Sequence, residues 1–175
     1  MKKILAFAGS TSSTSINKQL ATFAAENLKK TNFYVADLRE FNVPIYSTDE
    51  EANGFPEDAK KFSDLLDNYD GFIVSLAEHN GSFAAAYKNI FDWSSRLNKK
   101  VFRDKPVLVM ATSPGGRGGA NVLNTAVSYY PYMGAKDIVS FSLPGFYDNF
   151  KEGKIVNEDY LNELKEKVTE FEKLI

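Results

Sequence analysis

The chain has 175 residues, of which 43% are hydrophobic and 25% are charged, and its formal net charge at pH 7 is −2. These values are typical of a globular protein, so we expect residues 1–175 to form a single domain. The small net charge gives no electrostatic support for a nucleic-acid partner. With no cysteine and only one histidine, His79, the sequence excludes a disulfide framework and a cysteine- or histidine-rich metal site.

Two lysines and a short apolar run open the sequence, a pattern that resembles a secretory signal peptide. The run at residues 4–8 is only five residues long, which is too short for the apolar segment of such a peptide. We therefore interpret it as a buried first strand and expect a cytoplasmic protein. No stretch reaches the length of a membrane-spanning helix, so we expect no membrane partner.

Short apolar runs alternate with segments of helical periodicity along the chain. Strands are expected at residues 4–8, 32–37, 71–76, 106–111 and 136–141. Helices are expected at residues 15–30, 56–68 (with Pro56 as the first helical residue), 83–97 and 120–133, the last of these interrupted late by Pro131. A final helix follows its candidate cap, Asn157. Five alternations without a repeat or linker predict an α/β three-layer sandwich with a five-stranded parallel sheet in the flavodoxin-like order 2-1-3-4-5.

Two longer segments lie between these elements and have no clear period. Residues 38–54 contain aromatic and apolar side chains, so we expect a loop that packs on the rest of the protein. Residues 144–150 are also rich in aromatic side chains. This second loop either closes over a site or covers the core.

Six consecutive hydroxyl-bearing residues, 10–15, follow the first strand and lead into a helix. At such a turn the free N–H groups, the hydroxyls and the positive end of the helix dipole face one point, which creates an anion site. Ser and Thr also cap helices and fill loops without a ligand, so the alternative is a purely structural turn. For six such residues together we favour the phosphate site.

Three stronger signatures are absent from the sequence. It has no Gly-Lys-Ser/Thr, which excludes a P-loop NTPase, and no G-x-G-x-x-G dinucleotide fingerprint. It has no acidic pair after the first strand, which argues against a receiver domain that must hold Mg²⁺ on carboxylates. A hydroxyl loop without a lysine suits the phosphate of a mononucleotide such as FMN.

Two further loops leave predicted strands with small, polar and glycine residues, at residues 77–82 and 112–119. In a parallel sheet the loops after the first, third and fourth strands share one rim. The four glycines between residues 115 and 119 allow a backbone to approach a flat ligand, although this turn alone is equally explained without one. Three such loops on one rim favour a shared ligand site.

Three segments together resemble the NADPH-dependent FMN reductase family, which has the flavodoxin-like fold and includes quinone, azo-dye and chromate reductases. Residues 9–17 resemble its G-S-x-R-x-x-S-x-N phosphate loop, and residues 113–119 resemble its S-x-G-x-x-G-G turn. Residues 78–82 with 88–96 resemble P-E-Y-N-x-S followed by L-K-N-x-x-D-W-x-S-R. The similarity extends from the first strand to about residue 141.

The resemblance implies an enzyme that moves a hydride from NADPH or NADH to FMN and passes electrons to a flavin, quinone, azo or similar acceptor by a ping-pong mechanism. It implies a homodimer or homotetramer. It also implies no essential catalytic side chain and no metal, because the flavin supplies the chemistry. The alternatives are a flavodoxin-like electron carrier and a flavin-free binding protein that kept the fold. The residues expected to bind FMN are Gly9, Ser10, Ser12, Ser15, Ile16, Asn17, Ala77, Glu78, His79, Asn80, Gly81, Ser113, Gly115 and Gly116.

The sequence departs from the family pattern in two of these loops. Ser12 stands where the phosphate loop of the family has arginine, and Lys18 and Arg117 are candidates to supply the missing charge. Ala77 and His79 stand where the family has proline and tyrosine. The planar imidazole of His79 either lies against the flavin or is a solvated loop side chain.

The helix expected at residues 83–97 contains large aromatic and charged side chains. Phe91 and Trp93 are expected in the core or at a subunit interface rather than against a ligand. Asp92 and Arg96 are four residues apart, which predicts a local ion pair. The resemblance places this helix near a subunit interface, where Arg96 would serve assembly.

Overall fold

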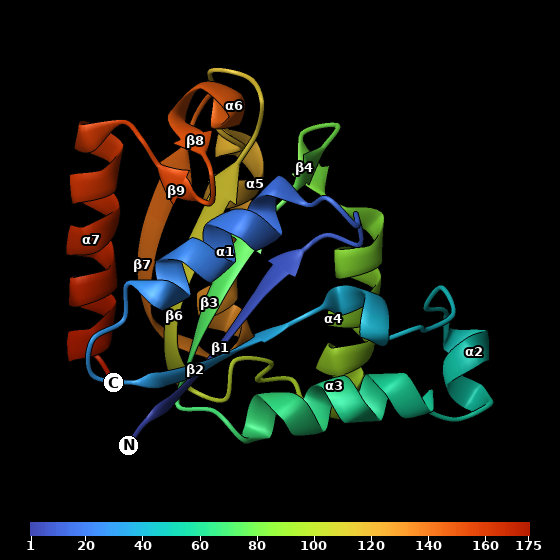
Figure 1. The fold of residues 1–175 in the computed structure, drawn as a ribbon. Coiled ribbons are helices and arrows are strands. Elements are labelled where there is room, and N and C mark those ends of the chain that lie inside the picture. Colours follow the sequence, from blue (N-terminus) through green and yellow to red (C-terminus); the bar gives the residue numbers. More distant parts are fainter.

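The computed structural model describes all 175 residues and has a central five-stranded sheet in the order β2-β1-β3-β6-β7 (Figure 1). Every neighbouring pair of strands in this sheet is parallel. Its strands are β1 (Lys3–Gly9), β2 (Asn32–Ala36), β3 (Gly71–Leu76), β6 (Lys105–Thr112) and β7 (Ala135–Leu143). Numbered among themselves, they have the order 2-1-3-4-5, which confirms the predicted flavodoxin-like sandwich.

Helices cover both faces of the sheet (Figure 1). One face is covered by α1 (Ile16–Glu26) and α7 (Glu158–Lys173), and the other by α3 (Glu57–Asp67), α4 (Ala85–Leu97) and α5 (Ala120–Tyr129). Alternate residues of each strand contribute to the two cores: Ile4 belongs to the core under α1 and α7, and Leu5 to the opposite core. Because both of their faces are buried, the central strands β1, β3 and β6 are nearly continuous apolar runs, whereas the edge strands β2 and β7 contain exposed and polar residues.

The apolar run near the start of the chain forms most of β1. This strand pairs with β2 on one side and β3 on the other, and Ile4, Leu5 and Ala6 have no exposed surface. The predicted buried strand is therefore confirmed. None of the helices combines the length and the apolarity needed to cross a membrane.

The ends of several helices differ from the prediction. The first helix stops at Glu26 rather than at residue 30, and Pro56 is the N-cap of α3 instead of its first helical residue. The predicted interruption of the helix at residues 120–133 is confirmed: α5 is followed by a 3₁₀ turn, η2 (Tyr130–Met133), because Pro131 has no N–H to continue the α-helix. The predicted cap of the last helix is confirmed, since Asn157 Oδ1 accepts the N–H groups of residues 159 and 160 at 3.1 and 3.3 Å.

The loop predicted at residues 38–54 contains a 3₁₀ turn, η1 (Leu38–Glu40), and a short helix, α2 (Thr48–Ala52). As predicted, it packs on the rest of the protein. Trp93 of α4 is fully buried and its Nε1 donates to the Pro44 carbonyl at 2.8 Å, while Tyr46 and Phe55 contact its ring edge to face. Trp93 thus lies in a structural contact, as expected.

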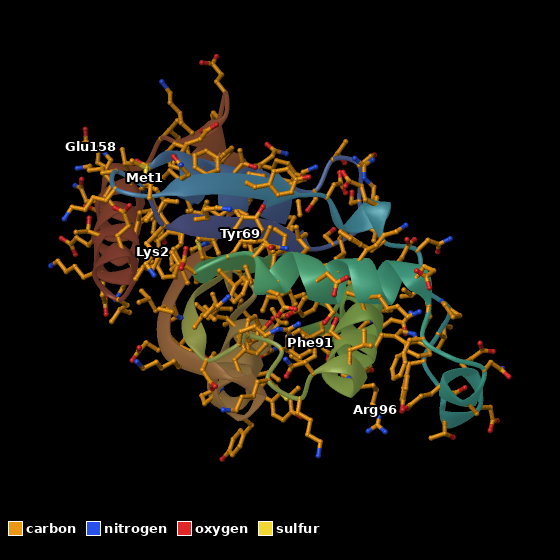
Figure 2. The ribbon with its side chains drawn as sticks, turned by 90° about the horizontal axis from the view of Figure 1, so that it is seen from below. Met1, Lys2, Tyr69, Phe91, Arg96 and Glu158 are labelled. Atoms are coloured by element: carbon orange, nitrogen blue, oxygen red, sulfur yellow. The ribbon has the colours of Figure 1, made fainter.

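The predicted ion pair between Asp92 and Arg96 is wrong. Arg96 Nε instead donates to Glu51 Oε2 of α2 at 2.9 Å, and Asp92 pairs with Lys88 at 2.7 Å. Figure 2 shows Arg96 on α4, with α2 beside it. The short helix α2, which no sequence period revealed, places a carboxylate beside the guanidinium, and Lys88 is the cation four residues before Asp92.

Candidate functional site

The loops after β1, β3 and β6 meet at a pocket of about 340 Å³ at the carboxyl ends of the strands. The shared rim predicted from the sequence is therefore present. The pocket wall contains hydroxyls, amides and a carboxylate but no lysine or arginine. It is formed by Ser10, Ser12, Thr14, Ser15, Ile16, Asn17, Ala77, Glu78, His79, Thr112, Ser113, Pro114 and Tyr147.

Fourteen residues were predicted to bind the cofactor, and the structure brings nine of them together in this wall. The five that do not line it are Gly9, Asn80, Gly81, Gly115 and Gly116. Four wall residues were not predicted: Thr14, Thr112, Pro114 and Tyr147. Thr14 lies within the hydroxyl run, and Thr112 and Pro114 flank Ser113, so proximity along the chain was the available signal for these three.

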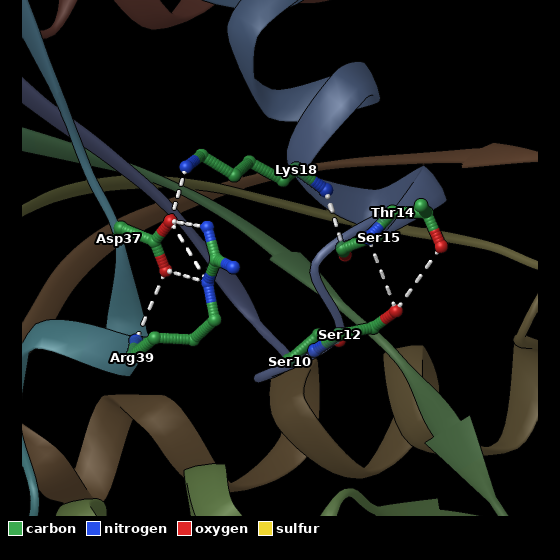
Figure 3. A network of polar contacts seen from close by, with 7 residues as sticks. All are labelled: Ser10, Ser12, Thr14, Ser15, Lys18, Asp37 and Arg39. Atoms are coloured by element: carbon green, nitrogen blue, oxygen red, sulfur yellow. Dashed lines mark hydrogen bonds and ion pairs between the residues drawn. The ribbon is translucent and has the colours of Figure 1, made fainter.

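The hydroxyl loop presents several hydrogen-bond donors at the N-terminus of α1 (Figure 3). Ser15 caps the helix, since its Oγ accepts the Lys18 N–H at 3.1 Å, and Ser10 Oγ accepts the Ser12 N–H at 3.2 Å. The N–H groups of Ile16 and residue 17 donate to no protein acceptor. Together with the helix dipole, these N–H groups and the two serine hydroxyls give the N-terminus of α1 a set of donors that could hold an anion.

Asn17 is buried beneath this loop and joins α1 to the sheet. Its Nδ2 donates to the Thr112 carbonyl at 3.2 Å, and its Oδ1 accepts from the Thr112 N–H at 3.1 Å and from Ser75 Oγ at 2.7 Å. The amide therefore pairs with both backbone groups of Thr112, as a neighbouring strand residue would. Its side-chain amide is thus used by these bonds, whereas its backbone N–H has no protein acceptor.

The loop after β3 is a two-residue β-hairpin of β4 (Glu78–His79) and β5 (Ser82–Phe83). Asn80 and Gly81 form its turn, with φ angles of 51° and 75°. Asn-Gly is a strong signal for this type of turn, although these two residues were predicted only as part of a ligand loop. The turn places Asn80 and Gly81 at an exposed tip, which explains why they do not line the pocket.

The Glu78 side chain reaches α5, and this contact was not predicted. Its Oε2 accepts the Val122 N–H at 3.0 Å in the first turn of that helix, and its Oε1 accepts from Asn121 Nδ2 at 3.4 Å. A carboxylate at a helix N-terminus is favourable because it meets the unpaired N–H groups and the positive end of the dipole. Glu78 thereby fixes the hairpin beside the glycine turn that precedes α5.

The glycines between residues 115 and 119 have two different roles. Gly115 and Gly116 are exposed, and a Cβ at either would meet no atom within 4 Å. Gly118 is buried at φ 57°, and a Cβ there would lie 2.3 Å from Ser142 Oγ. The first two leave open space beside the pocket for a flat ligand, whereas Gly118 is required by the packing of the turn against β7.

Gly9 also has a packing role in the structure. A Cβ at this position would lie 3.0 Å from both Leu76 and the Tyr87 ring of α4. The residue is buried at the end of β1, behind the hydroxyl loop. Gly9 therefore allows α4 to approach the first strand and does not itself face the pocket.

The predicted aromatic loop at residues 144–150 is divided between the core and the pocket. It forms α6 (Phe146–Asn149) and leads into a hairpin of β8 (Phe150–Lys151) and β9 (Lys154–Ile155). Phe146 and Phe150 are buried and stack on one another, while Tyr147 is 64% exposed and lines the pocket. Phe146 and Phe150 therefore cover the core, which is one of the two predicted alternatives, and Tyr147 contributes to the pocket wall.

Neither candidate for the missing arginine reaches the pocket wall. Lys18 Nζ lies 2.6 Å from Asp37 Oδ2, and Arg117 Nη2 donates to Asn121 Oδ1 at 2.8 Å. Hydrogen bonds from Arg39, with a smaller effect of Lys18, hold the pKa of Asp37 well below its usual range. His79 is exposed and lines the pocket from β4, which is compatible with both of its predicted alternatives.

Comparisons with known proteins agree with this fold and pocket. The family model for NADPH-dependent FMN reductase matches residues 2–148. A 2-hydroxy-1,4-benzoquinone reductase from Burkholderia sp. is 32% identical over 90% of this chain and 87% of its own length. An NADPH azoreductase from Bacillus sp. is 33% identical, over 51% of this chain and 48% of its own.

The fold is also found among solved structures. The flavoenzyme NAD(P)H:(acceptor) oxidoreductase FerB from Paracoccus denitrificans superposes with a TM-score of 0.78 at 22% identity, covering 99% of this chain and 97% of FerB. At that identity the likeness establishes the shared architecture only. The match of the family model to most of the chain, with the quinone reductase similarity, establishes more: this chain is an oxidoreductase of the NADPH-dependent FMN reductase family.

Proposed function

We propose that the protein binds FMN in the pocket at the carboxyl ends of β1, β3 and β6 and uses NADPH or NADH to reduce small acceptors such as flavins, quinones and azo compounds. One observation supports this most directly. The donor-rich N-terminus of α1, the hairpin at Glu78 and the turn at Ser113 converge on one pocket. The family description and the quinone reductase and azoreductase relatives support the choice of cofactor and acceptors.

The residues of the pocket fit the two ends of FMN. The hydroxyls of Ser10 and Ser15 and the free N–H groups of Ile16 and Asn17 would hold the phosphate. Residues 77–81 of the hairpin segment and the turn at residues 113–116 would flank the flat ring, and backbone N–H groups there would stabilise negative charge on it. Bound FMN would accept a hydride from the nicotinamide and release electrons to the acceptor, so no side chain needs to act as acid, base or nucleophile.

The steady-state kinetics should follow a ping-pong pattern. The three loops surround one pocket, and the ring can offer only one open face, so the nicotinamide and the acceptor would occupy the same space in turn. Initial rates measured with NADPH and a benzoquinone should give parallel double-reciprocal lines, and NADP⁺ should compete with the quinone. Because an exposed ring face offers few groups for recognition, an azo dye should also be reduced. Converging lines would show a ternary complex and contradict the one-site model.

Two alternative functions are separated from this proposal by simple measurements. A flavodoxin-like electron carrier would bind flavin but would not oxidise NADPH without a protein partner. A flavin-free binding protein would be colourless and would not quench flavin fluorescence on titration. NADPH oxidation by the yellow, purified protein in the presence of a quinone alone would exclude both.

Ser12→Arg should tighten FMN binding by about tenfold, which is the effect of one charge-assisted hydrogen bond. Ser12 lines the pocket, and its backbone contact to Ser10 Oγ does not depend on its side chain. A guanidinium there could pair with the phosphate through two parallel bonds. Ser13→Arg is the matched control, because it adds the same charge to the same loop at a residue outside the pocket wall. Equal FMN affinities for the two variants would refute the expected contact.

We further propose that the protein acts in the cytoplasm as a homodimer or homotetramer. The position of the N-terminal apolar run supports the location, since its cleavage would remove β1, which pairs with two other strands. The family resemblance supports the assembly. Sedimentation equilibrium of the full chain would determine the oligomeric state directly.

A further inference from the structure

A bound phosphate monoester would meet no cationic side chain in the pocket wall. Such a group has a charge of about −1.5 to −2 at pH 7, and strong phosphate sites normally add a cation to their N–H donors. Beside the hydroxyl loop, however, the structure holds two cations on a single carboxylate. Lys18, Asp37 and Arg39 form this cluster (Figure 3).

The cluster has one more positive than negative charge. Lys18 Nζ and Arg39 Nη2 both lie 2.6 Å from Asp37 Oδ2, and Arg39 Nε donates to Oδ1 at 3.0 Å. The Asp37 side chain is only 13% exposed, whereas those of Lys18 and Arg39 are 35% and 47% exposed. The carboxylate is therefore the most buried member of the cluster, and one side-chain hydrogen bond joins Lys18 to it, whereas three join Arg39 to it.

Lys18 occupies an unusual position for a cation. It lies in the first turn of α1, at the positive end of the helix dipole, where a lysine is unfavourable unless an anion is near. Asp37 is that anion in the structure. Lys18 also lines a groove beside the hydroxyl loop, together with residues 13–15.

We propose that Lys18 exchanges Asp37 for the phosphate when FMN binds, so that the lysine supplies the charge that the loop itself lacks. The inference rests on the proposed function. This exchange would not leave Asp37 unpaired. Its carboxylate keeps the hydrogen bonds from Arg39 Nε and Nη2 and from the Arg39 backbone N–H, the last at 3.0 Å. Asp37 and the phosphate therefore compete for Lys18, and Asp37 lowers the affinity for FMN.

The test is a titration of the full-length apo protein with FMN and with riboflavin, which lacks the phosphate, followed by flavin fluorescence. Lys18→Gln should weaken FMN binding about tenfold, and Asp37→Asn should tighten it severalfold by releasing the lysine. Neither variant should change riboflavin affinity. Asn at residue 37 retains an oxygen for the Arg39 N–H. Lys30→Gln is the control, because it removes the same charge from an exposed residue beyond the C-terminal end of α1.

The double variant Asp37→Asn/Lys18→Gln should bind FMN like Lys18→Gln alone, because the gain from the asparagine requires the lysine. Lys18→Arg, which keeps the charge, should retain most of the affinity and exclude a folding defect as the cause. An unchanged FMN affinity in Lys18→Gln, or an equal loss for riboflavin, would overturn the exchange. If the unmodified protein bound neither flavin, the proposed function itself would fail.

Discussion

Replacing Ser10 and Ser15 together by alanine is expected to weaken FMN binding by roughly 10²- to 10⁴-fold. Each hydroxyl would donate to a charged phosphate, and a hydrogen bond to a charged group contributes about 1.5–3 kcal/mol. In the structure both oxygens accept backbone N–H groups and both residues line the pocket, so each hydroxyl hydrogen is still available to donate. Fluorescence titration of the double variant with FMN measures the loss.

Two comparisons separate this loss from a general loss of structure. Ser15 also caps α1, so its removal should cost about 1 kcal/mol of stability. Ser47→Ala is the matched control, since Ser47 Oγ caps α2 by accepting the Glu50 N–H at 3.1 Å and lies outside the pocket. Riboflavin affinity should be nearly unchanged in the double variant. FMN binding equal to that of the unmodified protein would show that the loop does not hold the phosphate.

Asn17→Ala is expected to lower the free energy of unfolding of the apo protein by roughly 3 kcal/mol. The change leaves three buried groups without a partner, namely Ser75 Oγ and both backbone groups of Thr112. Unpaired buried polar groups cost about 1–3 kcal/mol each, and partial rearrangement reduces the sum. Urea unfolding followed by far-UV circular dichroism measures the difference.

A second asparagine of the same helix provides the control for this prediction. Asn27, at the C-terminal cap of α1, donates from Nδ2 to the Phe23 carbonyl at 2.8 Å and is only partly buried. Asn27→Ala should therefore cost about 0.5–1 kcal/mol. Equal losses for the two variants would mean that Asn17 does not stabilise the junction between α1 and the sheet.

The sequence was sufficient to predict the sheet because its signals are local. A strand buried on both faces must be a continuous apolar run, and the runs at residues 4–8 and 71–76 are such strands. The short connections between strands and helices then require parallel strands in a layered sandwich. The same rule places the loops after β1, β3 and β6 at one edge, so the position of the pocket followed from the topology.

The missed elements had weaker or overlooked local signals. The short helix α2 spans only five residues, too few to show a helical period. The hairpin at residues 78–83 had a clear signal in the Asn80-Gly81 pair, but these two residues were predicted only as ligand contacts. Element ends such as Glu26 also depend on capping contacts rather than on the apolar pattern.

By itself, the sequence determined the fold class, the three loops that meet at the pocket and the hydroxyl-rich composition of the phosphate loop. Only the tertiary structure decided which partners the polar side chains take. Asn17 bonds to Thr112, Glu78 to the first turn of α5, and Lys18 to Asp37, and each pair joins segments at least 19 residues apart. The reason is physical: a period or a turn follows from neighbours in the chain, whereas the partner of a buried or charged group depends on which segments the folded core brings within hydrogen-bonding distance.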